Sequence, residues 1–427
     1  MLKGAAVEFD ITPPVGVRLA GYGSRTGASE GIHDPLMGQV LVLTSSDNQT
    51  VVIATLDLIA VSTEFSGKLR SILWEENQIE PKNVMVACAH THSGPEGFLS
   101  ALPFLREEPN PTLEEITLQK IVGAVRWAYR LLQPVHLLSG SDWVAGIGLN
   151  RNDPVQGSVD QQLSALRVDD ENHHPIAVLF NYGCHPTVMG DDNYLISADY
   201  PGAARKLLHK TYPDATFMFC NGGSGDVSTR FSRREASFNE VDRLGSLVAA
   251  SVLKAMNTAE ICQSQDLASK LFQLDLPVKE FQDEAAVKQS ITESKKELEE
   301  MRKRGDAHGE QRKIITKIEG AEIQLILAAG FSNQKTVPIE LQAFIIGDYR
   351  IFSIPGEPFS KTVIDIKEHF TPQPVMVISY ANGYAGYLPE HEEGQSATYE
   401  DFVSPYTSEA AKLIKTAIFT HLANING

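Results

Sequence analysis

The stretch Val84-Met-Val-Ala-Cys-Ala-His-Thr-His-Ser-Gly-Pro-Glu-Gly97 runs from an apolar segment into a loop with several polar side chains. Its first part, Val84–Cys88, is apolar and favours β-structure, so it predicts a buried strand. His90 and His92 follow two residues apart, and this spacing places both imidazoles on one face of an extended segment. Such a pair can chelate a cation, supply one ligand and one acid/base, or belong to an ordinary loop.

Strands and helices alternate along the chain around this stretch. Further strands are predicted at Thr50–Asp57, Ile176–Tyr182, Thr216–Cys220 and Val375–Tyr380, with a hairpin of Ile339–Ile346 and Arg350–Ile354 around Gly347-Asp348. Helices are predicted after Ser62, after a capping box at Thr112–Glu115, near Pro201–Leu208, and over Pro358–Phe370 and Ser408–Leu422. This order predicts an α/β fold, with a large mixed or parallel sheet, helices on both faces, and one catalytic domain over residues 1–427.

A charged segment with helical periodicity interrupts this pattern at about residues 280–330. It breaks at Gly305-Asp306 and therefore predicts a helical hairpin inserted into the domain. The hairpin could form a lid, a spacer or a contact between copies in a homo-oligomer. A solvated insertion packed on the main domain is the simplest interpretation.

Composition limits the partners and the compartment. The formal net charge of -17 disfavours nucleic acid and anionic membrane surfaces as partners. The sequence contains no apolar run long enough to span a bilayer and no signal peptide, although secretion stays open. The four cysteines are far apart without a CxxC pair, which favours reduced thiols. We therefore expect a cytoplasmic protein without a membrane span.

Reactive side chains follow five of the predicted strands. They are His90 and His92, His185, Asp226 and Ser228, Glu357, and Tyr384 and Tyr387. Ligands of open α/β sheets bind at the carboxyl ends of strands, so these loops could meet in one pocket. Histidines from separate strands together with a carboxylate suit Zn²⁺ with one position left for water. Each residue alone is better explained as structural: Ser228 as a turn cap, Glu357 as a surface residue and Tyr387 as a packed aromatic.

Taken together, these motifs resemble the neutral/alkaline non-lysosomal ceramidase family. The matching segments are Asp-Ile-Thr-Pro (10–13), His-Thr-His-Ser-Gly-Pro (90–95), Asn150-Arg151, Cys-His-Pro-Thr (184–187), Ile-Ser-Ala-Asp (196–199), Gly-Asp-Val-Ser (225–228), Pro-Gly-Glu (355–357) and Tyr-Ala-Gly-Tyr (384–387). They occur in the family's order and span nearly the whole chain, without the family's C-terminal immunoglobulin-like domain.

The resemblance implies a role for each matching residue. The implied zinc ligands are His90, His185, Glu357 and Tyr387, with Tyr384 as the alternative to Tyr387. The implied catalytic and substrate-contacting residues are His92 as acid/base, Ser228 at the family's active-site serine, Arg151 and Tyr399. The segment Leu388–Ser396 is acidic and polar where the family has tyrosines, and it favours a fairly polar N-acylated small molecule over ceramide.

These residues predict a zinc-dependent hydrolase that cleaves a linear C–N amide bond by metal-activated water. In this hypothesis Arg151 steadies the developing oxyanion and His92 transfers protons. Ser228 either attacks the amide, with Asp226 or a histidine beside it, or hydrogen-bonds the substrate, and we favour the second role. The alternatives are a metal hydrolase of the amidohydrolase-barrel class, acting on another amide, ester or lactone, and a non-catalytic metal-bearing binding protein.

Overall fold

The computed structural model describes residues 1–99, 109–306, 308–331, 333–391, 398–423 and 425. Its largest sheet has the strand order β11-β9-β8-β6-β1-β3-β4-β5, with β13 beside β6. These strands are β1 (Lys3–Asp10), β3 (Met37–Thr44), β4 (Thr50–Leu56), β5 (Val84–Cys88), β6 (Gln133–Trp143), β8 (Gln162–Asp170), β9 (Pro175–Tyr182), β11 (Thr216–Asn221) and β13 (Glu260–Ile261).

A second sheet has four strands in the order β14-β15-β16-β18. Their bounds are β14 (Leu267–Pro277), β15 (Thr336–Ile346), β16 (Tyr349–Ile354) and β18 (Val375–Ser379). Three short pairs complete the strands: β2 (Gly31–Ile32) with β10 (Leu195–Ile196), β7 (Leu149–Asn150) with β12 (Val227–Ser228), and β17 (Glu357–Pro358) with β19 (Tyr387–Leu388).

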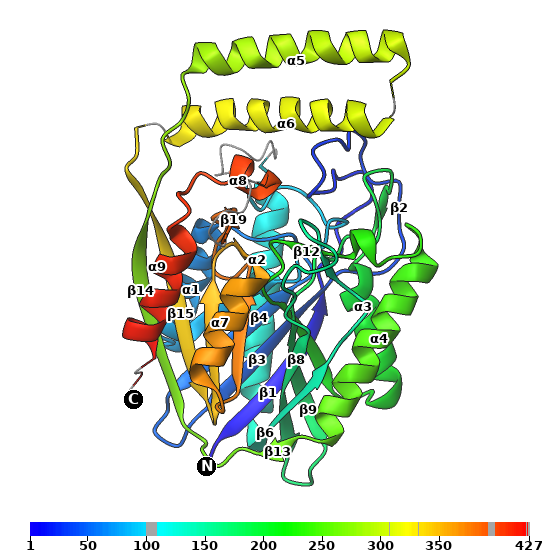
Figure 1. The fold of residues 1–427 in the computed structure, drawn as a ribbon. Helices are drawn as coiled ribbons and strands as arrows, with labels where there is room; N and C mark the ends of the chain where they lie inside the picture. The colour runs from blue at the N-terminus through cyan, green and yellow to red at the C-terminus, as the bar shows by residue number, and fades with distance from the viewer. Residues whose placement is uncertain (100–108, 307, 332, 392–397, 424, 426–427) are drawn as a thin grey trace.

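The helices lie outside these sheets (Figure 1). They are α1 (Thr63–Asn77), α2 (Pro111–Leu131), α3 (Asp199–Thr211), α4 (Phe238–Asn257), α5 (Glu284–Arg304), α6 (His308–Phe331), α7 (Ser360–Phe370), α8 (Tyr399–Val403) and α9 (Ala410–Ala417). Short 3-10 segments occur at Pro81–Asn83 and Thr229–Phe231, and a π-helical turn follows α9 at Ile418–Leu422. Among the described residues, no helix is long and apolar enough to cross a bilayer.

Three β-layers enclose one central core. Strands β1 and β6 pair over only two residues each, and the large sheet divides there into two halves. Strand β11 of one half lies close to β3, β4 and β5 of the other, and β18 of the second sheet lies close to β5 and β9. Met85, Met218 and Met376, one from each layer, share this core. The layers therefore face one another and present their opposite faces to helices.

The outer faces are covered by helix pairs because side chains alternate along each strand. Helices α1 and α2 pack on β3, β4 and β5. Helices α3 and α4 pack on β8, β9 and β11, and α7 and α9 pack on the four-stranded sheet. The α/β class and the large mixed sheet are therefore confirmed, and the structure adds the division of the sheet and the second β-layer.

Most predicted elements form close to their predicted bounds, and two boundaries were wrong. Helix α2 begins at Pro111 and not after a capping box at Thr112, because the Asn110 side chain accepts a hydrogen bond from the Leu113 N–H at 3.1 Å. Helix α7 begins at Ser360, because Glu357 and Pro358 pair with β19 as a short strand. Residues 392–396 of the acidic segment lie outside the described residues.

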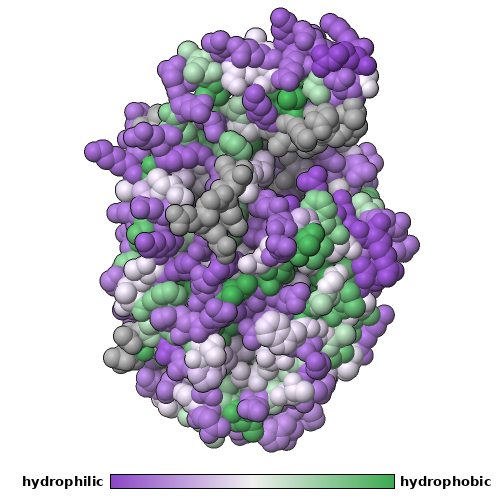
Figure 2. All heavy atoms as spheres, in the orientation of Figure 1, coloured by the Kyte–Doolittle hydropathy of each residue, from purple (hydrophilic) through white to green (hydrophobic). Residues whose placement is uncertain are grey.

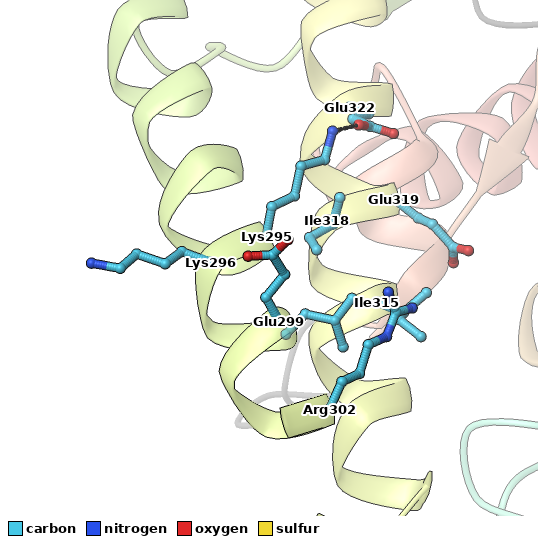
Figure 3. A pocket seen from close by; sticks show the side chains of 9 residues that line it. Lys295, Lys296, Glu299, Arg302, Ile315, Ile318, Glu319 and Glu322 are labelled. Carbon is cyan, nitrogen blue, oxygen red and sulfur yellow. Dashed lines mark hydrogen bonds and ion pairs between the residues drawn. The ribbon is translucent and has the colours of Figure 1, made fainter. Parts of the chain in front are cut away.

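The charged insertion is a two-helix hairpin that joins the antiparallel neighbours β14 and β15. Gly305 ends α5 in the left-handed conformation, as the predicted break requires. Val287, Ile291, Leu298 and Ile318 pack between the helices, while hydrophilic side chains dominate the exterior of this end of the molecule in Figure 2. The hairpin lies at the top of Figure 1, next to α8, and α6 contacts α8.

Candidate metal centre

Three histidines from two strand ends meet in the interior. One ring nitrogen each from His90, His92 and His185 lies within 4.8 Å of the other two. His90 comes two residues after β5 and adopts a positive φ of 69°, which is uncommon for a residue with a side chain. His185 comes three residues after β9 and pairs with Ser228 in an isolated bridge. The predicted convergence of these two loops is therefore observed.

Glu357 joins this cluster from the start of β17. Its Oε2 lies 3.0 Å from His185 Nε2 and 3.7 Å from His90 Nε2, and all three side chains are buried. Gly225 allows this approach, since a Cβ at that position would lie 2.5 Å from the Glu357 carbonyl oxygen. The absence of a side chain at Gly225 thus lets β17 pack against the 222–225 loop.

The orientation of the rings fits a cation. Nδ1 of His90 lies 2.7 Å from the Ile59 carbonyl oxygen, and Nδ1 of His185 lies 2.6 Å from that of Ser224. Nδ1–H donation to these carbonyls leaves Nε2 of both rings with a free lone pair, as in metal-binding histidines. His185 Nε2 is buried and, although Glu357 Oε2 lies 3.0 Å away, it makes no hydrogen bond in the described structure. A divalent cation between these side chains would be bound by the Nε2 lone pairs of His90 and His185 and by a carboxylate oxygen of Glu357.

Burial sets the charge state of the cluster. It lowers the pKa of His90 to about 3, despite the nearby Glu357 carboxylate. Burial also lowers the pKa of His92 well below its usual value, and the neighbouring His90 and His185 add to this effect. Burial alone would raise the pKa of Glu357, but His90 and His185 bring it down to about 2. At neutral pH His90 and His92 are therefore neutral and Glu357 is a carboxylate, which is the state of these groups that binds a cation.

Two buried side chains that sequence reasoning missed tie the loops together. Asn221 donates from Nδ2 to the carbonyls of Ala89 and Cys184, next to both histidines. The Tyr380 ring stacks on His90 at 3.8 Å, and its hydroxyl lies 3.2 Å from Glu357 Oε2. Asn221 directly follows the predicted strand Thr216–Cys220, and Tyr380 ends the predicted strand Val375–Tyr380. A polar residue at the end of an apolar strand was the available signal.

His92 is held by the loop that follows β1. Its Nε2 lies 3.3 Å from His90 Nε2, and the Tyr22 ring lies 4.9 Å from its own ring. Gly21 packs directly against the imidazole with φ of 93°. Buried Arg25 donates from Nη1 to the carbonyl oxygens of Leu19, Ala20 and His92. His92 is thus held in position by the loop that follows β1, and not only by the loop after β5 in which it lies.

The two candidate tyrosines have different contacts. Tyr384 donates its hydroxyl to Glu357 Oε1. Tyr387 pairs with Glu357 along the backbone, while its ring lies 5.4 Å from the Arg151 guanidinium carbon and 6.2 Å from the Tyr399 ring. Burial and the Glu357 charge raise the pKa of Tyr387 well above its usual value, so its phenol is neutral without a cation. Its role as the fourth ligand stays a prediction.

Arg151 lies beside Tyr387 and is fixed at two points. Its Nε donates to Glu400 Oε1 at 2.6 Å, and its Nη2 donates to the Gly225 carbonyl at 2.8 Å. Burial opposes its charge, but Tyr387 and Glu400 raise its pKa well above the usual value. Tyr399 begins α8 and is 42% exposed, so it lies at the solvent side of this group. Glu400 is a further site residue that sequence reasoning missed, although it directly follows Tyr399.

Ser228 lies next to the cluster, and its contacts are those of a residue that caps a turn. It bridges to His185 through the backbone, and its Oγ accepts from the Arg230 N–H at 3.4 Å at the start of a 3-10 turn. Asp226 does not set its environment: Asn150 Nδ2 and the Ser360 N–H, both at 2.7 Å, occupy the two carboxylate oxygens. In the described residues, no imidazole or carboxylate hydrogen-bonds the Ser228 Oγ.

The chain is similar to known ceramidases in sequence and fold. A family model described as neutral/alkaline non-lysosomal ceramidase, N-terminal, matches residues 4–240. Neutral ceramidase B of Dictyostelium discoideum is 27% identical over 256 residues, which cover 53% of this chain and about a third (35%) of that protein. Neutral ceramidase of Pseudomonas aeruginosa is 26% identical over 467 aligned positions, covering 92% of this chain and 68% of that protein.

Solved structures share the fold. A structure titled "Ceramidase complexed with C2" superposes with a TM-score of 0.75 at 18% identity, over 99% of this chain and 74% of that one. The crystal structure of neutral ceramidase from Pseudomonas aeruginosa gives a TM-score of 0.74 at 19% identity, over 98% and 73% of the two chains. Because the family model matches more than half of the 427 residues, the chain belongs to the neutral/alkaline non-lysosomal ceramidase family.

Proposed function

We propose that this chain is a zinc-dependent hydrolase that cleaves the C–N bond of a linear N-acyl amide. The observation that carries the proposal is the buried meeting of His90, His185 and Glu357, with two histidines anchored through Nδ1 on backbone carbonyls. Nitrogen and oxygen donors of this kind suit Zn²⁺. When bound, the ion would polarise the amide carbonyl and acidify a water molecule. Ceramide is the reference substrate, since the relatives carry that name.

The remaining residues have roles that follow from their positions. His92 accepts a proton from the attacking water at Nε2 and passes it to the leaving amine. Arg151, fixed at two points, donates to the developing oxyanion. Tyr399 contacts the substrate from the solvent side. Ser228 hydrogen-bonds the substrate and is not the nucleophile, because no base hydrogen-bonds its Oγ in the described structure.

The other functions are weaker. An amidohydrolase barrel requires a closed sheet, whereas the described large sheet is open, with β11 and β5 at its edges. A binding protein without catalysis would not need the fixed guanidinium of Arg151 beside the proposed metal ligands. Cytoplasmic location and self-association through the α5–α6 hairpin stay predictions.

The test combines metal analysis with turnover. The purified chain should contain about one zinc per molecule and hydrolyse members of an N-acyl amide series that varies in chain length and head group, ceramide included. His90→Ala should lose both metal and turnover. His136→Ala is the matched control, because His136 stacks on His173 instead of joining the cluster. Zinc without turnover of any acyl substrate would favour the binding protein, and trapping of an acyl group on Ser228 would overturn its proposed role.

A further inference from the structure

Helix α8 connects the candidate site with the charged insertion. On its inner side, Glu400 is only 1% exposed. Glu400 Oε1 accepts from Arg151 Nε at 2.6 Å, and Oε2 accepts from Asn152 Nδ2 at 3.1 Å. Both carboxylate oxygens thus hold the Arg151 segment. A helix of five residues has little stability of its own, so its position depends on what packs around it.

The insertion holds α8 from the other side. Helix α6 contacts α8 where Gly320 faces Phe402, and a Cβ built on Gly320 would lie 3.6 Å from Phe402 Cβ. Glu319, the neighbouring residue of α6, acts electrostatically on Tyr399. The groove between α5 and α6 itself is lined largely by charged side chains such as Lys295, Arg302 and Glu322.

The stem of the insertion makes a second attachment. Lys279, which follows β14, donates from Nζ to the Asp401 carbonyl at 2.7 Å and the Phe402 carbonyl at 3.4 Å. Its backbone N–H donates to the Pro405 carbonyl at 2.9 Å. An ammonium at the last carbonyls of a helix is favourable, because these carbonyls carry partial negative charge. Helix α6 of the insertion therefore contacts one side of α8, and Lys279, just before the insertion, holds its carboxyl end.

We propose that the α5–α6 insertion positions Arg151 through α8, with Glu400 as the positioning residue. The inference rests on the proposed function, because it assigns Arg151 to the substrate oxygen. An arginine side chain loses conformational freedom when it is ordered, and binding is stronger when this loss precedes substrate binding. The contacts from Glu400 and Gly225 order the guanidinium beforehand, so loosening α8 weakens binding of the developing oxyanion.

The first test removes the charge of Glu400. Glu400→Gln keeps the shape but not the charge-assisted hydrogen bond, and we expect kcat/KM to fall about tenfold, mainly through kcat, because Arg151 acts on the developing oxyanion. Asp169→Asn is the matched control, because Asp169 is equally buried and forms a bidentate pair with Arg167 on β8. In an Arg151→Lys background, Glu400→Gln should have little further effect, since a residue that acts through Arg151 is not additive with it.

The second test leaves the site chemistry intact. Gly320→Phe places a ring between α6 and α8, and we expect the same fall in kcat without a lower melting temperature. Lys317→Phe adds the same ring at an exposed position of α6 and should leave kcat unchanged. An active wild type in which neither Glu400→Gln nor Gly320→Phe differs from its control overturns this inference alone. A wild type without amide turnover overturns the proposed function and the inference with it.

Discussion

Gly21→Ala tests whether His92 belongs to the site. A Cβ on Gly21 would lie 2.3 Å from His92 Nδ1 and 2.5 Å from its Cγ. Ordinary contacts between such atoms are about 3.5–4.0 Å, so the imidazole must retreat by about 1 Å or more. Because a misplacement of about 1 Å can lower turnover about 100-fold, we expect a loss of that order in kcat/KM.

The backbone also contributes to this change, and Gly16 provides the control. Gly21 has φ of 93° and Gly16 has φ of 103°, in a region that residues with a side chain rarely adopt. Alanine at either position should cost about 1–3 kcal/mol of folding stability. A Cβ on Gly16 meets nothing within 4 Å, so Gly16→Ala shares the backbone strain without touching His92.

The assay is kcat/KM on the best N-acyl amide, with melting temperatures for the wild type and both variants after zinc loading. Similar melting temperatures with a selective loss of activity in Gly21→Ala would support a catalytic His92. Equal activity of Gly21→Ala and Gly16→Ala would refute the reasoning, because a displaced His92 would then have no consequence.

Three further variants test the surroundings of the site. Tyr380→Phe removes the hydroxyl beside Glu357 and should weaken zinc binding about 10- to 100-fold in chelator competition, whereas Tyr349→Phe, a buried tyrosine bonded to two distant carbonyls, should not. Burial lowers the pKa of Lys279 to about 8, below its unfolded value of about 10.4, so wild-type stability should rise relative to Lys279→Met between pH 8 and 10. In denaturant titrations this gain should not exceed about 2 kcal/mol, because the side chain is partly exposed, and a constant or falling difference would contradict it. Arg205→Met should lower the free energy of unfolding by about 3–5 kcal/mol in the same titration, because it leaves buried Asp57 unpaired. Adding Asp57→Leu to this variant should restore most of the lost stability.

The sequence by itself determined the local elements and the types of residue in the site. Val84–Cys88 forms the predicted strand, and the hairpin around Gly347-Asp348 forms as its turn residues require. Apolar runs and turn residues act over a few positions, so their effect is readable without the fold. The start of α2 was misplaced by the same local reasoning, because two caps, Asn110 and Thr112, compete within three residues and only one forms.

The tertiary structure decided which of these residues meet. Glu357 reaches His185 only because β17 packs beside the 222–225 loop. This packing leaves no room for a side chain at position 225, which is a glycine. Tyr380, Asn221 and Glu400 became visible as site residues only through contacts with segments far away in the chain. Long-range contacts depend on how the β-layers enclose the core, and no short segment of sequence encodes that arrangement.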